Sequence, residues 1–309
     1  MQPDDRSRGL RILAEQQAIR WRSLVDRFDA LVASGAPRRT LLVALSPGLE
    51  PTRAFAATRD WAGMAGSPRR TGILVLSGAV GVGKSVAAAR YALDTGARWA
   101  QATALGQEEY SRAARLVQRL IKAPCLVLDE VGGPGSTTPA AIARVSEVLV
   151  QRHAAGRPVV VTTNLDIDEI GMAYDGVRSD ESRLADRIRE NGAYVECRRE
   201  ISFRKEGGIG PDSRENHHRI ATRGLHLFDL VAGGETNERA LDELQDLLCC
   251  TDDDVAQASK SSGFTPQVQG QIEALLEKVR PERQASPATC TSVPHQASQG
   301  AFGELEAIS

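Results

Sequence analysis

Short apolar runs alternate with segments of helical periodicity through the middle of the chain. The apolar runs predict five strands, at residues 72–77, 98–102, 125–128, 158–163 and 193–197. Between the strands, apolar side chains recur every three or four residues, which predicts helices at 85–93, 107–122, 139–154 and 180–190. This order is typical of a three-layer α/β fold, in which helices cover both faces of a parallel five-stranded sheet.

Two regions flank this middle part. Residues 10–33 carry apolar side chains at helical spacing, and Gly35-Ala36-Pro37 ends that pattern. Beyond residue 204 the pattern weakens, and we predict only two short helices in a largely disordered tail, at 237–248 and 266–279. The pair His217-His218 is interpreted as part of a solvated loop. The sequence thus predicts a helical segment over 1–34, an α/β domain over 35–204 and a mostly disordered tail over 205–309.

Charge is unevenly distributed, although the net charge is only −2. Residues 1–70 contain 12 Arg against 7 Asp and Glu, whereas residues 205–309 contain 9 Lys and Arg against 17 Asp and Glu. The five cysteines form no C-x-x-C pair, which argues against a zinc site or a disulfide framework. The first residues are polar and no apolar stretch reaches the ~20 residues of a membrane span. We therefore expect a cytoplasmic protein that does not enter the membrane.

A glycine-rich segment follows the first predicted strand and precedes a helix. Glycine lets the backbone curl so that its N–H groups point inward, and the start of the helix adds positive dipole character. This arrangement predicts a phosphate cradle in which a lysine reaches the β- and γ-phosphates and a serine hydroxyl ligates Mg²⁺. The residues of this loop and the first helical turn are Gly78, Ala79, Val80, Gly81, Val82, Gly83, Lys84, Ser85 and Val86.

Two carboxylates stand at the end of the third predicted strand. The apolar run 125–128 leads directly into Asp129 and Glu130, and ligands of α/β folds bind at the carboxyl edge of the sheet. We assign Asp129 to Mg²⁺, with Ser85, and Glu130 to the orientation and activation of an attacking water. An apolar strand that ends in Asp-Glu is common and by itself indicates only a strand followed by a loop. We assign it a role because the phosphate cradle lies upstream in the same predicted fold.

Further candidates follow strands four and five. Asn164 ends strand four and would face the γ-phosphate if that strand lies between strands one and three; in isolation it reads as a turn residue. Arg183 and Arg187 are four residues apart and share one helix face. Such a face is ordinarily solvated, but it also suits an arginine that completes the site of a neighbouring subunit. Arg204 follows strand five, within reach of the γ-phosphate of its own subunit.

With these elements in order, residues 35–204 resemble the AAA+ ATPases of the helicase-loader group, the DnaC-like and IstB-like proteins. The resemblance rests on the phosphate loop, Leu128-Asp129-Glu130-Val131-Gly132, Thr162-Thr163-Asn164, the arginine helix 182–187, and the run from 194–197 to 203–204. It implies a sheet ordered 5-1-4-3-2, ATP and Mg²⁺ as ligands, and Asn164 and Arg204 as nucleotide sensors. It also implies Arg187, with Arg183 as second choice, as an arginine finger acting between subunits.

The resemblance further implies function and partners. It implies an ATP-hydrolysing homo-oligomer that acts in DNA replication as a helicase loader, with a replicative helicase and single-stranded DNA as partners. An IstB-like transposition helper, with a transposase as partner, is one alternative. A nucleotide-gated adaptor with little turnover is another, although Glu130 argues against it, because a gate needs no water-activating carboxylate. In each case we expect the segment 10–33 to dock onto the partner protein.

Overall fold

Five parallel strands form the centre of the part of the protein that the computed structural model describes, which comprises residues 3–46, 52–63, 72–177, 181–197, 216–234 and 237–260. Their order is β2-β3-β4-β1-β5, and all four neighbouring pairs are parallel. This confirms the predicted order 5-1-4-3-2. The strands are β1 (Ile73–Ser77), β2 (Arg98–Gln101), β3 (Leu126–Val131), β4 (Val159–Thr163) and β5 (Ala193–Glu196).

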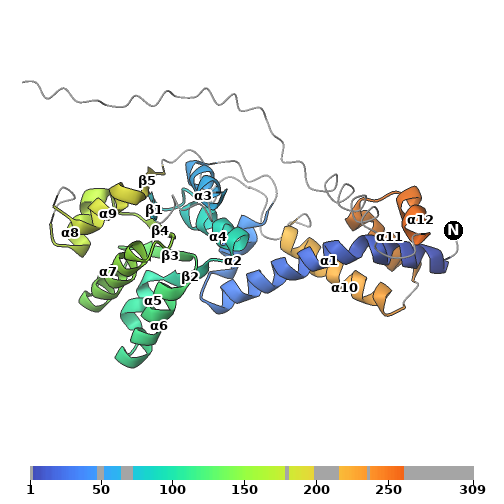
Figure 1. The fold of residues 1–309 in the computed structure, drawn as a ribbon, viewed down its shortest axis with the longest axis horizontal. Coiled ribbons are helices and arrows are strands. Elements are labelled where there is room, and N and C mark those ends of the chain that lie inside the picture. Colours follow the sequence, from blue (N-terminus) through green and yellow to red (C-terminus); the bar gives the residue numbers. More distant parts are fainter. Residues whose placement is uncertain are drawn as a thin grey trace, which may run out of the picture.

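Helices cover both faces of this sheet (Figure 1). One face carries α2 (Arg38–Ala44), α3 (Arg53–Gly63) and α4 (Lys84–Thr95). The other face carries α5 (Ala102–Gln107), α6 (Tyr110–Lys122), α7 (Pro139–Ala154), α8 (Ile167–Tyr174) and α9 (Arg183–Asn191). The helix predicted over 107–122 matches α6, whereas α5 was not predicted. The two helices are separate because Glu108 and Glu109, which lie between them, do not have helical backbone angles. We call the sheet with these eight helices the sheet domain.

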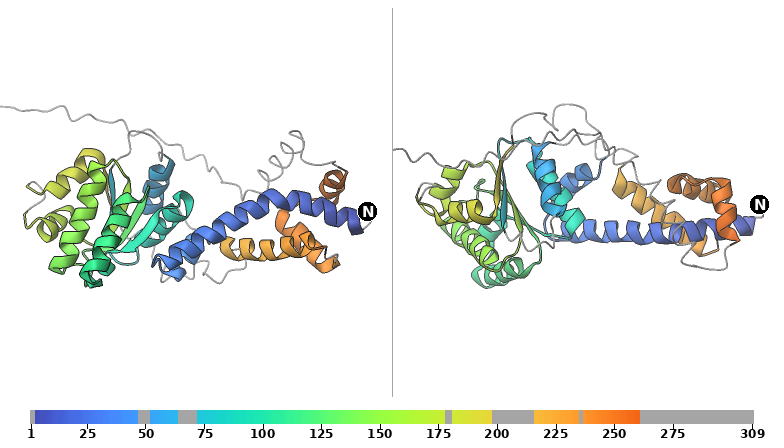
Figure 2. Two further views of the ribbon diagram at one scale, coloured as in Figure 1. Left: turned by 60° about the horizontal axis from the view of Figure 1, so that its bottom comes forward. Right: turned by 45° about the horizontal axis from the view of Figure 1, so that its top comes forward.

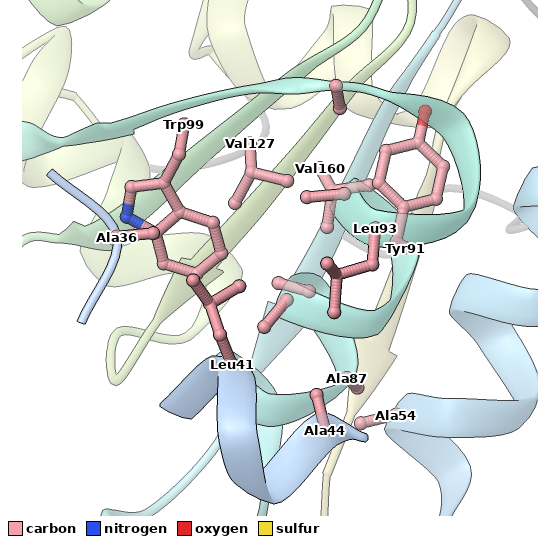
Figure 3. Packing of buried hydrophobic residues seen from close by; sticks show 14 of the residues in the cluster. Ala36, Leu41, Ala44, Ala54, Ala87, Tyr91, Leu93, Trp99, Val127 and Val160 are labelled. Carbon is pink, nitrogen blue, oxygen red and sulfur yellow. The ribbon is translucent and has the colours of Figure 1, made fainter. Parts of the chain in front are cut away.

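The strands divide their side chains between two apolar clusters. Successive residues of a strand point to opposite faces, so Leu74 and Leu76 pack on the side of α4 while Ile73 and Val75 pack on the side of α7. Figure 3 shows the first cluster, where Trp99, Val127 and Val160 of the sheet meet Tyr91 and Leu93 of α4, and Leu41 and Ala44 of α2. Both faces of the central strands are therefore buried, as their apolar sequences predict.

A second region extends from the sheet domain. The helix α1 (Pro3–Ala33) is 31 residues long. Between Arg6 and Phe28 it contacts α10 (His217–Ala232), α11 (Glu238–Leu248) and α12 (Asp252–Ser259). Figures 1 and 2 show these three helices side by side with α1, away from the sheet. We call α1 with α10, α11 and α12 the helical arm.

Small side chains allow the helices of the arm to approach one another closely. A Cβ atom at Gly224 of α10 would lie 2.4 Å from the ring of Trp21, and one at Gly9 of α1 would lie 2.3 Å from the carbonyl oxygen of Val255. The apolar side of α1 that we expected to dock onto a partner thus packs against the C-terminal helices of its own chain. The apolar residues buried in the arm are Leu10, Leu13, Ala14, Trp21, Ala221, Leu227, Val231, Ala240, Leu241, Leu244, Leu248, Val255 and Ala258.

The C-terminal region differs from its prediction at residues 217–232. These residues form α10, and His218 is 9% exposed on that helix rather than part of a solvated loop. The helix was missed because its buried stripe includes small residues, Ala221 and Gly224, which do not register as an apolar period. The predicted helix 237–248 matches α11, whereas the one predicted at 266–279 lies outside the described residues.

Several contacts join the arm to the sheet domain. Asn216, fully buried, donates from Nδ2 to the Leu42 carbonyl at 2.7 Å and to Ser46 Oγ at 3.2 Å. The guanidinium of Arg38 in α2 lies over the ring of Phe28 in α1, 5.3 Å from the ring centroid. Arg27 of α1 donates to the carbonyl oxygen of Leu93, 2.8 Å away in the last turn of α4. The base of the arm is thus bonded to α2 and to the helix that begins at the glycine-rich loop.

Candidate nucleotide site

The glycine-rich loop lies between β1 and α4, as the sequence predicts. Gly78, Gly81 and Gly83 have φ angles of 142°, 92° and 88°, a region that side chains strongly disfavour. Gly78 is constrained a second time, because a Cβ there would lie 2.3 Å from the carbonyl oxygen of Cys197. Gly83 immediately precedes Lys84, the first residue of α4. The loop therefore presents backbone N–H groups and a helix N-terminus at one point, which is the geometry that binds phosphate.

Lys84 joins this loop to β4. Its Nζ donates to the carbonyl oxygens of Gly78 and Ala79 at 2.6 and 2.8 Å, and to Asn164 Oδ1 at 2.9 Å. The lysine is 8% exposed, and burial lowers its pKa, an effect opposed by Cys197 and Asp129. Asn164 follows β4, which lies between β1 and β3. The sheet thus brings Asn164 to the lysine across 80 residues of sequence.

Ser85 and Asp129 form a second link. Ser85 Oγ donates to Asp129 Oδ1 at 2.8 Å, and Thr162 Oγ1 donates to the same oxygen. Asp129 is 2% exposed. Burial raises the pKa of its carboxyl group, while the hydrogen bonds from Thr162 and Ser85 act in the opposite direction. A buried carboxylate with hydroxyl partners is a group that a cation would stabilise further.

Glu130 stands beside this cluster in an unusual conformation. Its φ is 59°, and its side chain is exposed in a strand whose other residues are buried. The backbone N–H of Glu130 donates to Thr162 Oγ1 at 3.0 Å. Thr162 contacts both carboxylate residues, yet it carried no role in the sequence prediction, which considered only Asn164 in that segment. The strand order could have identified it, because β4 lies beside β3 and Thr162 therefore lies next to Asp129 and Glu130.

Tyr174 also escaped prediction. The N–H of Gly132 donates to its hydroxyl oxygen at 3.1 Å, which ties the loop after β3 to the end of α8. The next residue, Asp175, accepts through Oδ2 from Ser182 Oγ at 2.6 Å and from the N–H of Leu184 at 2.9 Å. The start of the arginine helix α9 is therefore fixed to the end of α8.

The predicted arginines lie apart from this cluster. Arg183 is exposed and Arg187 half-buried on α9, and Arg187 Nη1 donates to the Arg183 carbonyl at 3.2 Å. The apolar residues of α9 pack into the cluster on the sheet face opposite to α4. Among the contacts of the described residues, the bonds that gather Lys84, Ser85, Asp129 and Asn164 include neither arginine. Arg204 lies outside the described residues.

The residues present fit a magnesium nucleotide. Ser85 and Asp129 provide hydroxyl and carboxylate oxygens, which Mg²⁺ prefers, and the loop provides the phosphate cradle. Within the described part of the chain, no three His, Cys, Asp or Glu side chains gather where they could hold a metal ion. Ser85 and Asp129 would therefore share Mg²⁺ with phosphate oxygens and water.

A parallel sheet of this order with a glycine-rich loop after β1 has the three-layer fold of P-loop AAA+ proteins. No protein-family profile matches the chain, and no curated protein matches it in sequence. In the helices that the structure describes, none combines the length and apolar character needed to cross a bilayer.

Solved structures that the chain is similar to include those of DnaI, the replication initiator DnaA and the DnaC helicase loader. DnaI is 20% identical, covering 52% of this chain and 94% of that one, with a TM-score of 0.43. The replication initiator DnaA bound to AMPPCP and single-stranded DNA is 14% identical, covering 79% and 67%, with a TM-score of 0.42. The DnaC helicase loader is 17% identical, covering 47% and 89%, with a TM-score of 0.36. At these identities and TM-scores the likenesses carry no statement about function.

Proposed function

We propose that the protein binds and hydrolyses ATP and acts in DNA replication as a helicase-loader-like AAA+ ATPase. One observation carries the nucleotide part of the proposal: Lys84 and Ser85, at the start of α4, bond to Asn164 and Asp129 at the ends of two other strands. Three segments distant in sequence thus place a cation, two hydroxyl or carboxylate oxygens and an amide at one sheet edge. Motif resemblance supports the replication part.

Each residue has a role that its position permits. Lys84 and the loop N–H groups bind the phosphates, and Ser85 and Asp129 hold Mg²⁺, which neutralises negative charge on the phosphates when bound. Glu130 accepts a proton from water and orients it, and Asn164 positions that water beside the γ-phosphate. The exposed carboxylate of Glu130 suits this role, because a general base must reach solvent or substrate.

Hydrolysis needs a second copy of the chain in this proposal. Arg187 acts as the finger on the neighbouring subunit, with Arg183 as second choice, and Arg204 acts within its own subunit. Supporting this, the bonds of Arg187 lie within α9, so its guanidinium is not committed to the phosphate loop of its own chain. An arginine supplied in this way contributes about 10³–10⁵ in rate.

Complementation between variants tests the shared site. We expect Arg187→Ala to bind ATP normally and to lose about 10³-fold in hydrolysis, while Glu130→Gln binds ATP without turnover. Mixing the two variants should restore activity, because the intact arginine of one completes the intact site of the other. Arg189→Ala, on the same helix, is the matched control and should hydrolyse ATP normally. Equal activity of Arg187→Ala and the wild type would refute the shared site.

Single-stranded DNA is the proposed nucleic-acid partner, and α6 offers the surface for it. Arg112, Arg115, Arg119 and Lys122 are exposed along this helix, which contains no acidic residue. Such a row attracts phosphates, and each phosphate contact contributes about 0.7 to the salt slope of single-strand binding. We expect Arg115→Gln with Arg119→Gln to reduce that slope in a fluorescence anisotropy titration. Arg90→Gln on α4, which removes an exposed cation elsewhere, should leave it unchanged.

The protein partner distinguishes the loader from its alternatives. We expect the full-length chain, purified from its host with ATP and Mg²⁺, to retain a replicative helicase; recovery of a transposase would favour the transposition helper instead. Single-turnover hydrolysis with and without single-stranded DNA separates both from a nucleotide-gated adaptor, which would bind ATP with little turnover. The helical arm, rather than α1 alone, is the proposed docking unit, because its helices pack as one cluster.

A further inference from the structure

The pairing of β3 with β4 is irregular next to the nucleotide site. Leu128 lies opposite Val161 and Val131 lies opposite Thr163. Two residues of β3, Asp129 and Glu130, therefore face the single residue Thr162 of β4, which defines a β-bulge. In a regular strand the side chains of Asp129 and Glu130 would point to opposite faces of the sheet. The bulge removes this strict alternation and changes the direction of the Glu130 side chain, which is exposed while that of Asp129 is buried.

This bulge stores backbone strain at Glu130. A φ of 59° places a residue with a side chain in the left-handed region, which is energetically unfavourable for any residue other than glycine. Strained conformations persist only where surrounding contacts determine them. One such contact is local, because the Glu130 carbonyl oxygen accepts from the N–H of Gly133 at 3.1 Å. The other must satisfy the Glu130 N–H.

Thr162 supplies that second contact. Its Oγ1 accepts from the Glu130 N–H at 3.0 Å and donates to Asp129 Oδ1. Because the hydroxyl proton is used toward Asp129, the oxygen lone pairs remain for the N–H, and both bonds form at once. Thr162 is 1% exposed, so water cannot replace either bond. Asp129 Oδ1 also accepts from Ser85, which connects the hydroxyl to the start of α4.

From these contacts we infer that Thr162 is a positioning residue for hydrolysis: its hydroxyl holds the bulge that aims Glu130 while orienting Asp129. The inference rests on the proposed function, since it assigns Glu130 to the attacking water and Asp129 to Mg²⁺. Thr162 itself touches neither water nor phosphate in this scheme. Serine can replace it, because serine keeps the hydroxyl. Valine, which has the same shape, cannot.

Amide hydrogen exchange of the nucleotide-free protein tests the structural half of the inference. In protein labelled with ¹⁵N-glutamate, we expect the Glu130 amide to be protected in the wild type and in Thr162→Ser, and to exchange at least tenfold faster in Thr162→Val. Thr58→Val is the matched control, because Thr58 is a buried threonine that bonds within α3; it should leave the Glu130 amide unchanged. Unchanged protection in Thr162→Val would overturn the inference.

Steady-state kinetics tests the functional half. We expect Thr162→Val to lower kcat by about 10²-fold, the loss that a misplaced group causes, with KM and the affinity for a fluorescent ATP analogue little changed. Thr162→Ser should recover most of kcat. If Thr162→Val does not fold, Thr162→Ala removes the hydroxyl without added bulk and is read in the same way. Wild-type kcat in the hydroxyl-free variant overturns the inference.

The outcomes separate this inference from the proposed function. If the wild-type protein does not hydrolyse ATP, the proposed function fails, and the exchange of the Glu130 amide still decides whether Thr162 holds the bulge. If the wild type hydrolyses ATP and Thr162→Val loses both protection and kcat, both hold. Loss of protection with normal kcat would show that the bulge does not serve hydrolysis, and the inference would then fall alone.

Discussion

At the carboxyl end of the sheet, buried polar side chains bond to one another, whereas the shared core of the helical arm is an apolar cluster and the ion pairs lie at its rim. Lys84, Asp129 and Thr162 are each less than 10% exposed. In the arm, Arg6 pairs with Asp242 and Arg223 with Glu243, each at 2.6 Å and with at least one exposed partner. Burying polar groups costs stability. The sheet edge thus gathers the polar side chains of the candidate nucleotide site, whereas the arm is held together mainly by apolar packing.

The largest expected effect on stability is in the sheet domain. Arg152 is fully buried and donates to the carbonyl oxygens of Leu120, Ala123 and Pro158 at 2.6, 2.7 and 2.6 Å. Burial lowers its pKa to about 10, so it stays charged at neutral pH. We expect Arg152→Met to leave several carbonyl groups unpaired and to cost about 3 kcal/mol or more of unfolding free energy, measured by denaturant titration.

Arg157→Met provides the comparison for that result. Arg157 is half-buried and donates to one carbonyl oxygen, that of Ile121, at 2.7 Å. Its loss should cost about 1 kcal/mol. If the two variants lost similar amounts of unfolding free energy, the burial of Arg152 would not be what makes it important for stability.

In the arm, the critical position is a close approach rather than a hydrogen bond. Gly224→Ala should force α10 away from Trp21, since the added Cβ would meet the ring at 2.4 Å, and overpacking of this kind costs about 1–3 kcal/mol. Hydrogen exchange should show faster opening of α10 and α1, while ATP binding stays normal. Gly63→Ala, where nothing lies within 4 Å, is the control. Loss of ATP binding in Gly224→Ala would contradict the separation of the two regions.

Shortening the aromatic partner extends that test. In the double variant Gly224→Ala with Trp21→Leu, the added methyl group gains space, so part of the lost stability should return. Purely additive losses would mean that the clash with Trp21 is not the cause.

The same contrast explains what could be predicted from the sequence. The phosphate loop is local, since its glycines, lysine and serine are consecutive and lie between a strand and a helix, so Gly78–Ser85 could be located directly. The strand order followed from the resemblance and is confirmed. The bulge that brings Thr162 to Asp129 depends on register between strands 33 residues apart, which no local pattern specifies. The packing of α10 on α1 depends on Gly224 and Ala221, which carry no apolar signal. The domain boundaries and the roles of individual site residues remain predictions.

A smaller effect is expected where the two regions join. Asn216→Ala removes the donor to the Leu42 carbonyl and the N-cap of α10, whose His218 N–H donates to Asn216 Oδ1 at 3.1 Å. We expect a loss of about 1–2 kcal/mol, with faster hydrogen exchange at the start of α10. Asn216→Ser keeps a capping oxygen and should recover part of that loss. No difference between the alanine and serine variants would exclude the cap as a contributor.

The substitution with the smallest expected effect, Asp129→Asn, should raise the free energy of unfolding rather than lower it. Because burial raises the folded-state pKa of Asp129 above its ordinary value, its stabilising contribution is present at low pH and is lost as the pH rises through the folded-state pKa. We expect Asp129→Asn to be more stable than the wild type by ~1 kcal/mol at pH 7, a typical gain when a functional group is removed. The difference should vanish in acid, below the unfolded-state pKa. Thermal unfolding without nucleotide at both pH values measures it.

The central claim is that Lys84, Ser85, Asp129 and Asn164 form one site for magnesium and ATP. Isothermal titration calorimetry with ATP, with and without Mg²⁺, measures this directly on the full-length chain. We predict magnesium-dependent binding by the wild type, its loss in Lys84→Ala, and its retention in the arm variant Gly224→Ala. Folded wild-type protein that takes up no ATP in the presence of Mg²⁺ would contradict the assignment of this sheet edge.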